Sequence, residues 1–586
     1  MKYTFKMVLA LALLSFIACN RGERRNNSGE PIDPETHDLS GWNKVNPGLN
    51  ASFSSTNNSY KRSTPPLAGL QDTFILRSWR GEEVHLQVLL WSREEIGEIR
   101  IRTEADQGTP APGISSARHS IVKYVLSDEF INGCGERNKD TIAAHISPDI
   151  LEPGDKLTMG KNKTRPVWIS LETSSDCKPG IYYYNTEIES PSDSISLHFE
   201  IEVIDKELPP PSEWSFHLDL WQNPFSVARY HKVKLWSQSH WDLIKPLLEK
   251  LASAGQKCIT TTLNDKPWGG QTFDPFGSMI TWIKDDTGNW FYDYSVFDQY
   301  VTFAMACGIT NQINCYSMVP WNNRFIYYNE KTTTYEELVA VPGTEEYNNL
   351  WTPFLHDFRE HLRDMGWLHI TTIAMDERKE EDMKKIIDLI RSNAPEIKIS
   401  LAGNILQPSI DSEIYDLSIA IGLRPDRNDI IERVASGRPT TFYTCCARPE
   451  HPNNFTFSPP ADNTYIGWYA AGKGYSGFLR WAYNSWVENP FYDSRFRTWP
   501  SGDTYLIYPD AISSIRFEKL IEGIKDFEKI KILKEDLALD PSMIAAKYEA
   551  ELEDFLSSID YTQLKERPSG DLVSEGQSLL YRIATR

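Results

Sequence analysis

The sequence lacks the features that mark several common classes of protein. It has no CxxC pair and no regular spacing of cysteine and histidine, so it predicts no metal site. No Gly-rich phosphate loop follows any expected strand, and we predict no cofactor. Basic residues are few relative to acidic ones, 61 against 81, and the formal net charge of −20 disfavours binding to nucleic acid or to anionic membrane surfaces. A neutral substrate suits this charge better.

The first residues are typical of an export signal. Lys2 and Lys6 precede an apolar run, 7–17, that is too short to span a bilayer, and Ala18 and Cys19 close it. A small residue directly before cysteine resembles a bacterial lipobox, so we predict a signal peptide over 1–18 and a lipid on Cys19. The expected location is a bacterial cell envelope membrane, periplasmic or surface-exposed, with membrane contact only through this anchor. Plain secretion, with Cys19 incidental, is the alternative.

Seven cysteines remain after Cys19, and most are expected to be buried thiols. The adjacent Cys445 and Cys446 are expected to be two such thiols, with a strained vicinal disulfide as the alternative.

The pattern of apolar residues divides the chain. Residues 19–66 are rich in Asn, Ser, Gly and Pro, which predicts a tether or a partly ordered leader. Over 67–208 apolar and polar residues alternate, as at Val84, Leu86, Val88 and Leu90, and the short strands are separated by turn residues. This predicts an antiparallel β-sandwich. Prolines 209–211 end the region, and we place a domain boundary there.

From 209 to 535, short apolar strands alternate with amphipathic helices, which indicates βα units around a parallel sheet. We expect strands at 216–221, 258–263, 310–316, 369–375, 397–401, 417–421, 440–444 and 477–483. Helices are expected at 241–253, 296–306, 347–365, 381–392, 429–436, 516–533 and 541–556. The repeats predict a (β/α)8 TIM barrel with C-terminal helices and a helical extension over 536–586. A doubly wound sheet is the alternative. The fold class is therefore multidomain, β followed by α/β.

Two neighbouring acids, Asp376 and Glu377, end the fourth expected strand, where barrel enzymes hold catalytic residues. The alternative is that they cap the next helix. The seventh expected strand, 440–444, carries no second acid, and Glu450 is the nearest. Glycosidases normally use two carboxyl groups on opposite sides of the bond, so this absence suggests that a 2-acetamido group of the substrate is the nucleophile. Glu377 would then be the acid and base, and Asp376 would bind the acetamido N–H.

Other side chains at strand ends are candidate sugar contacts. Tyr443 faces the acid pair and is expected to hydrogen-bond the acetamido oxygen, or else to pack in the barrel. Asp503 is expected either to bind a sugar hydroxyl or to cap a turn. The remaining candidates are aromatic and amide residues, each with a structural role as the alternative: Trp221, Asn223, Asn264, Trp268, Asn314, Tyr316, Asn404, Trp481, Tyr483 and Asn484.

Together with the acid pair, a C-terminal signature resembles glycoside hydrolase family 123. The signature reads PSGDTYLIYP at 500–509, SIRFE at 514–518 and EGIKDFE at 522–528, and the likeness covers roughly 73–534. The resemblance implies a retaining, substrate-assisted β-N-acetylgalactosaminidase, with Asp376 stabilising and Glu377 as acid and base. It also implies a glycan or glycolipid substrate with terminal β-linked N-acetylgalactosamine. A β-N-acetylhexosaminidase of other specificity and a non-catalytic, surface glycan-binding lipoprotein are the alternatives.

Overall fold

The computed structural model describes residues 29–106, 111–130, 135, 138–403, 407–446 and 450–586. The predicted signal peptide, the lipid site at Cys19 and the candidate contact Asn404 lie outside these residues. In the described part of the chain, no helix combines the length and apolar character needed to cross a membrane.

The N-terminal region contains two five-stranded sheets that share one hydrophobic core. The first has the order β1 (Asn50–Ser54), β3 (Glu83–Ser92), β8 (Lys163–Glu172), β5 (Arg118–Ser127) and β6 (His145–Pro153). The second has the order β2 (Thr73–Arg80), β10 (Ser194–Glu207), β9 (Gly180–Glu189), β4 (Gly97–Ala105) and β7 (Lys156–Met159). The strand pairs are antiparallel except β2 with β10, which run parallel. Alternation predicts which face of a strand is buried but not the direction of its neighbour, so the sequence pattern did not reveal this pair.

Part of the predicted leader belongs to this region. Strand β1 lies within residues 19–66 and pairs with β3, and Trp42 is buried against Leu89 and Trp91.

The second region is built on a parallel eight-stranded sheet that is nearly closed into a barrel. Its order is β11 (His217–Leu220), β22 (Gly477–Arg480), β21 (Thr440–Tyr443), β20 (Asp416–Ala420), β19 (Lys398–Ala402), β18 (Thr371–Met375), β15 (Gln312–Tyr316) and β12 (Cys258–Thr262). Each of the eight expected segments overlaps one of these strands. The end strands β11 and β12 are joined by a single bridge between Leu218 and Gln256 and by a bond from Lys257 N–H to the Leu218 carbonyl, 2.9 Å.

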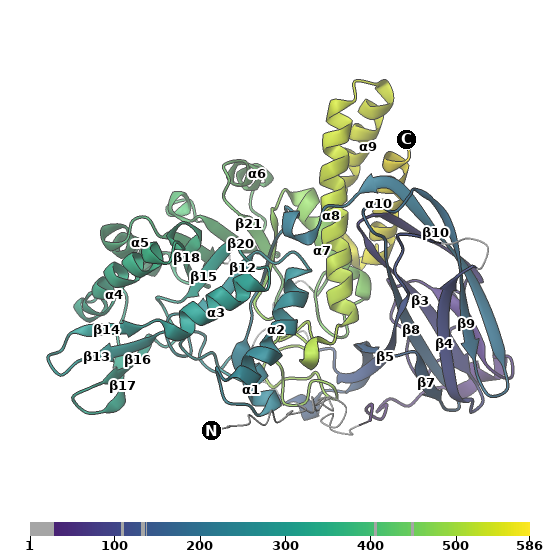
Figure 1. Ribbon diagram of the computed structural model, residues 1–586, viewed down its shortest axis with the longest axis horizontal. Helices are drawn as coiled ribbons and strands as arrows, with labels where there is room; N and C mark the ends of the chain where they lie inside the picture. Colours follow the sequence, from purple (N-terminus) through teal and green to yellow (C-terminus); the bar gives the residue numbers. More distant parts are fainter. Residues whose placement is uncertain (1–28, 107–110, 131–134, 136–137, 404–406, 447–449) are drawn as a thin grey trace, which may run out of the picture.

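Helices cover the barrel and extend beyond it (Figure 1). The expected helices appear as α2 (Gln238–Ala252), α3 (Ser295–Ala306), α4 (Glu345–Asp364), α5 (Glu380–Asn393), α6 (Arg427–Ala435), α8 (Ile515–Leu539) and α9 (Met543–Ser558). Two others were not expected, α1 (Pro224–His231) and α7 (Pro460–Lys473), and α10 (Ser569–Ala584) lies in the predicted helical extension over 536–586. A four-stranded sheet was also missed, and it forms the edge of the molecule farthest from the N-terminal sheets: β13 (Thr281–Lys284), β14 (Trp290–Asp293), β16 (Arg324–Asn329) and β17 (Thr334–Val339).

Helix α8 lies between the barrel and the N-terminal sheets (Figure 1). On one side, Glu528 accepts the backbone N–H of Phe216, just before β11, at 2.7 Å. On the other, Lys525 donates to the carbonyl of Glu83 at 2.5 Å, and Lys529 pairs with Glu82 at 2.6 Å. The two regions are therefore held together by buried polar contacts from one helix.

The cysteine pair matches neither expectation. Cys446 is disulfide-bonded, whereas Cys445 carries a thiol, so the two do not form a vicinal bridge and are not both thiols. The sequence alone does not reveal which distant strand or loop approaches a cysteine, because a disulfide depends on the Cα separation in the folded chain.

Candidate active site

Asp376 and Glu377 follow the last residue of β18, at the carboxyl end of the barrel strands. The five residues of β18 are fully buried, so the strand fixes where the pair stands. Asp376 is buried, whereas Glu377 is exposed. The next helix, α5, has Lys379 as its N-cap and no side-chain capping bond, so the acid pair does not act as its cap. The two carboxyl groups are presented at the mouth of the barrel.

Asp376 is held by two neighbours that the sequence pattern did not reveal. The indole N–H of Trp321 donates to Oδ2 at 2.5 Å, and the guanidinium of Arg378 donates to Oδ1 at 2.6 Å. Burial raises the pKa of Asp376 above its ordinary value, and Arg378 and the Trp321 bond offset part of that rise. Arg378 could have been found from its place beside the pair. Trp321 stands in a loop without periodicity and carries no such signal.

Glu377 is bonded across the mouth of the barrel. The hydroxyl of Tyr443, at the end of β21, donates to Glu377 Oε1 at 2.7 Å. Burial and the neighbouring Glu377 carboxylate raise the pKa of the Tyr443 hydroxyl well above its usual value, so it remains a donor at any physiological pH. Tyr443, from the seventh expected strand, therefore meets the acid pair, as its position predicted.

Aromatic rings form the floor below the acid pair. The rings of Trp221 and Trp268 stack with centroids 4.8 Å apart, and Tyr316 lies 4.5 Å from the first and 5.0 Å from the second. These three rings belong to one buried cluster with Tyr443, and Trp481 packs against its edge. The indole N–H of Trp268 is buried without a hydrogen-bond partner among the described residues, and Trp221 interacts with Asp219 below the floor. The floor therefore offers mainly apolar ring faces to a ligand.

Comparison with protein-family models identifies the family to which the chain belongs. The model "Glycoside hydrolase 123, catalytic domain" matches residues 221–533, and "Glycoside hydrolase 123 N-terminal domain" matches residues 53–190. The chain belongs to glycoside hydrolase family 123. The predicted resemblance is thereby confirmed, and membership of family 123 makes the protein a glycosidase.

A solved structure agrees with the family 123 assignment. A family 123 glycoside hydrolase from Clostridium perfringens, studied for glycolipid glycan hydrolysis, is 28% identical with a TM-score of 0.82, covering 92% of this chain and 100% of that one. A termite-gut GH10 xylanase with a bacterial Ig-like domain is 10% identical with a TM-score of 0.32, covering 78% and 100% of the two chains. Bacteroides uniformis β-glucuronidase 3 is 10% identical with a TM-score of 0.28, covering 78% and 50%. The last two scores are too low to inform on function. No curated protein matches the chain.

Several predicted sugar contacts of this family 123 chain are occupied by bonds within the protein. Asn223 is the N-cap of α1, and its side-chain oxygen accepts the N–H groups of Phe225 and Ser226. The amide of Asn484 bonds both the N–H and the carbonyl of Asn223, at 2.8 and 2.9 Å. These two residues join the ends of β11 and β22 and face one another rather than the aromatic floor.

Tyr483 and Asp503 also lie in the packed protein. The Tyr483 hydroxyl donates to the carbonyl of Leu247, on α2, at 3.0 Å, which places the ring outside the barrel. Asp503 pairs with Arg480 at 2.5 Å, and both side chains are completely buried. Neither group reaches the acid pair in this structure.

Two further candidates are amides inside the barrel. Asn264 donates to the carbonyl of Ser317 at 2.5 Å and leaves its side-chain oxygen without a partner among the described residues. Asn314 donates to Asp219 at 3.1 Å and accepts from Thr372 at 2.7 Å, below the floor. Of the contacts predicted in the described chain, the structure gathers Trp221, Trp268, Tyr316, Tyr443 and Trp481 beside the acid pair.

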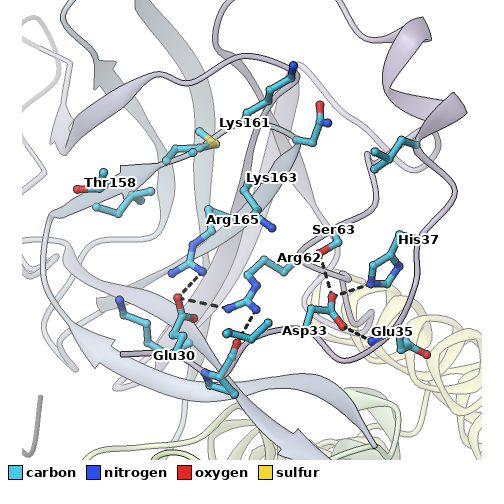
Figure 2. Close-up of a pocket in the computed structure, with 18 of the residues that line it drawn as sticks. Glu30, Asp33, Glu35, His37, Arg62, Ser63, Thr158, Lys161, Lys163 and Arg165 are labelled. Carbon is cyan, nitrogen blue, oxygen red and sulfur yellow. Dashed lines mark hydrogen bonds and ion pairs between the residues drawn. The ribbon is translucent and has the colours of Figure 1, made fainter. Parts of the chain in front are cut away.

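Two hollows stand out in the described structure. One, with a volume of about 570 Å³, is lined by Asp265, Lys266, Pro320, Asn322 and Arg324 among others, and two of these flank Trp321 in the chain. The other, of about 960 Å³, lies on the N-terminal sheets (Figure 2). There Arg165 pairs with Glu30 at 2.7 Å and His37 with Asp33 at 2.7 Å, so its charges are largely matched to one another. The first hollow is lined by Pro320 and Asn322, the chain neighbours of Trp321, and not by the acid pair itself.

No carboxylate from the seventh strand faces the pair. Strand β21 contains only Thr, Phe and Tyr residues, and Glu450 lies in the following loop with its side chain 49% exposed, 3.8 Å from His451. The site thus presents two adjacent acids, a phenol and an aromatic floor.

Proposed function

We propose that this family 123 glycosidase is a retaining exo-enzyme that releases terminal β-linked N-acetylgalactosamine through an oxazolinium intermediate. The observation that carries the proposal is the division of labour within the acid pair. Asp376 is buried and already accepts an N–H bond, whereas Glu377 is exposed and accepts a bond from Tyr443 across the mouth. The similar Clostridium perfringens enzyme, studied for glycolipid glycan hydrolysis, supports a glycolipid or glycan as the substrate class.

The proposed first step uses the acetamido group of the sugar. Its carbonyl oxygen attacks the anomeric carbon while the bond to the leaving oxygen breaks, and Glu377 gives its proton to that oxygen. The Asp376 carboxylate accepts the acetamido N–H on the side where it now accepts the Trp321 N–H. Its negative charge stabilises the positive charge of the oxazolinium. The Tyr443 hydroxyl orients the reacting groups on the opposite side.

In the second step water attacks the anomeric carbon from the face that the leaving group occupied. Glu377 takes the proton of that water, the ring of the oxazolinium opens, and the acetamido group is restored. Two inversions leave the configuration retained. The pyranose would rest on the floor of Trp221, Trp268 and Tyr316, and the remainder of the glycan would lie toward the hollow beside Trp321.

The proposal includes the architecture and the location. We take the two N-terminal sheets as a sandwich that is antiparallel apart from the β2–β10 pair and that begins early enough to include β1, and the nearly closed barrel as a (β/α)8 barrel. We also propose export and attachment through a lipid on Cys19, which brings the site to a membrane where glycolipid ends are displayed. A Cys19→Ser variant should leave the membrane fraction, and its recovery there at an undiminished level would contradict the anchor.

The test compares 4-nitrophenyl glycosides that differ at the 2- and 4-positions. The N-acetyl-β-galactosaminide should be hydrolysed well, the 2-hydroxy analogue hardly at all. Equal turnover of both would rule out assistance by the substrate. Faster turnover of the N-acetyl-β-glucosaminide would establish the other hexosaminidase specificity, and binding of oligosaccharide without hydrolysis would establish a lectin-like role.

Two variants and a matched control assign the roles. Glu377→Gln should lower kcat by about 10²- to 10⁴-fold on a poor leaving group and less on an activated phenol, because the phenol needs little protonation. Asp376→Asn should lower the rate on both leaving groups alike, by about 10²-fold or more. Glu450→Gln, which removes the acid nearest to β21, should retain wild-type activity. Loss of activity in Glu450→Gln with full activity in Asp376→Asn would instead indicate a conventional two-carboxylate mechanism.

A further inference from the structure

A second set of reactive side chains lies inside the barrel, two layers below the aromatic floor. Alternate residues of a barrel strand point inward, so His217 and Asp219 of β11 lie on the same side as Trp221. His217, at the start of β11, meets Cys258 at the start of β12 and Asp416 at the start of β20. The cluster is therefore at the amino end of the strands, opposite the acid pair.

The distances within this cluster match those between the ligands of a tetrahedral metal ion. Nε2 of His217 lies 3.3 Å from Oδ2 of Asp416 and 3.4 Å from Sγ of Cys258. Zinc bonds of about 2.0–2.3 Å at tetrahedral angles put two such ligand atoms about 3.4 Å (N and O) and 3.6 Å (N and S) apart. We propose that His217, Cys258 and Asp416 bind a divalent cation of the zinc type.

A second buried carboxylate lies beside the cluster. Asp219 is 2% exposed, its Oδ2 accepts the amide of Asn314 at 3.1 Å, and the indole of Trp221 interacts with the same carboxylate. A cation bound by His217, Cys258 and Asp416 would compensate the charge of both carboxylates, with a water as its fourth ligand.

The position of the cluster gives the ion a structural purpose. His217 and Cys258 belong to the two end strands, which are joined by the bridge between Leu218 and Gln256 and by hydrogen bonds of the buried Gln222 and Gln256 side chains. An ion bound by both residues and by Asp416 from β20 would add a further link across this seam. The His217 and Asp416 side chains are 12% and 8% exposed. An ion can therefore enter from the amino end of the barrel without passing the aromatic floor. Binding would release a proton from the Cys258 thiol.

The sequence pattern does not reveal such a site because its ligands are far apart in the chain. Cys258 lies 41 positions after His217 and 158 positions before Asp416. A metal motif is recognised by short, regular spacing, whereas here the barrel brings single residues from three strands together. The inference does not depend on which sugar the enzyme hydrolyses.

The test uses the full-length enzyme, purified in detergent without a histidine tag and without chelator. Elemental analysis should find about one zinc per chain. After exchange, Co²⁺ should give a near-ultraviolet thiolate-to-cobalt charge-transfer band. Cys258→Ser should abolish this band and Asp416→Asn should weaken cobalt binding at least tenfold. The matched control is Cys315→Ser, which removes a buried thiol on β15 that contacts Thr261 at 3.3 Å instead of the cluster, and it should keep the band.

Thermal unfolding of the wild-type enzyme supplies a readout that does not depend on any variant, and Cys258→Ser adds a comparison. Zinc should raise the Tm of the wild-type enzyme and a chelator should lower it, because a ligand that binds only the folded state stabilises it. Neither should change the Tm of Cys258→Ser. Wild-type protein that takes up neither zinc nor cobalt, or a cobalt band that persists in Cys258→Ser, would overturn the proposal.

Discussion

Asp376 must be an anion in order to stabilise the positive charge of the oxazolinium, although it is buried where ionisation is costly. The structure meets this demand with the cation of Arg378 and the indole N–H of Trp321. Burial still dominates, and the pKa of Asp376 is raised above its ordinary value. The ionised fraction of this one carboxyl should therefore set the acid limb of the pH–rate profile.

Trp321→Phe tests this reasoning, because it keeps an aromatic ring and removes the N–H donor. The donor stabilises only the ionised form, so its loss should raise the pKa of Asp376 and shift the acid limb of kcat/KM to higher pH. Trp481→Phe is the control, since Trp481 lies at the other edge of the floor. We expect this control to alter KM without moving the limb. If the acid limb does not move in Trp321→Phe, a group other than Asp376 sets it.

Asp503 offers a prediction of a different kind, because the sequence left open whether it binds sugar. Its carboxylate is paired with the completely buried guanidinium of Arg480. Asp503→Ala leaves that charge unpaired, which should lower the free energy of unfolding by about 3–5 kcal/mol. The kcat/KM of the molecules that remain folded should change little. A raised KM with unaltered stability would show instead that Asp503 contacts the substrate.

At the scale of elements, α8 carries two buried acids with opposite behaviour. Lys250 and His85 and a bond from Ser513 hold the pKa of Glu518 down to about 2 against the burial that raises it. Burial raises the pKa of Asp526 to about 6, and the charge of Glu522 adds to the rise. The folded-state pKa of Glu518 lies below its ordinary 4.5, so its contribution is present above about pH 4.5 and lost as pH falls toward 2. For Asp526 the order is reversed, and stability is lost as pH rises through about 6.

Neutral substitutions in α8 should therefore change stability in opposite directions at pH 7. Glu518→Gln should lower the free energy of unfolding by on the order of 2–3 kcal/mol, and the deficit should shrink as the pH falls below about 4.5. Asp526→Asn should raise it by on the order of 2–3 kcal/mol at pH 7 and bring no gain near pH 4. Denaturant titrations across this pH range measure both. Parallel curves for the two variants would contradict the assigned shifts.

The elements also show what sequence reasoning can reach. Each barrel strand was expected within a few residues, because a short apolar run followed by an amphipathic helix is a strong signal. Helix α7 was missed because nearly all of its residues are buried, which removes the apolar periodicity of a surface helix. In the site, Asp376, Glu377 and Tyr443 were predictable from their positions at strand ends. Trp321 was not, since a loop approaches the site through tertiary contacts that no local pattern encodes.

At the scale of the whole molecule, the regions share a core. The large apolar cluster of the barrel includes Trp79, Val125, Ile150 and Ile204 from the N-terminal sheets. Arg516, at the start of α8, donates to both oxygens of Asp149 on β6 at 2.9 and 2.8 Å, and Tyr508 donates to the same carboxylate at 2.6 Å. Such a buried, bidentate contact is of the kind that fixes geometry as well as adding energy.

This continuity predicts that the two regions unfold together, although they match two separate family models. Far-ultraviolet circular dichroism, which follows both regions, and the rate of glycoside hydrolysis, which follows the barrel, should give coincident denaturant transitions. Asp149→Ala should move that common transition to lower denaturant, by about 3–5 kcal/mol, because it leaves the Arg516 guanidinium buried without its carboxylate. Ser147→Ala, a neighbouring change on β6 whose hydroxyl contacts only His145 among the described residues, should leave it in place. Two separated transitions in the unmodified chain would show that α8 connects the regions without coupling their stability.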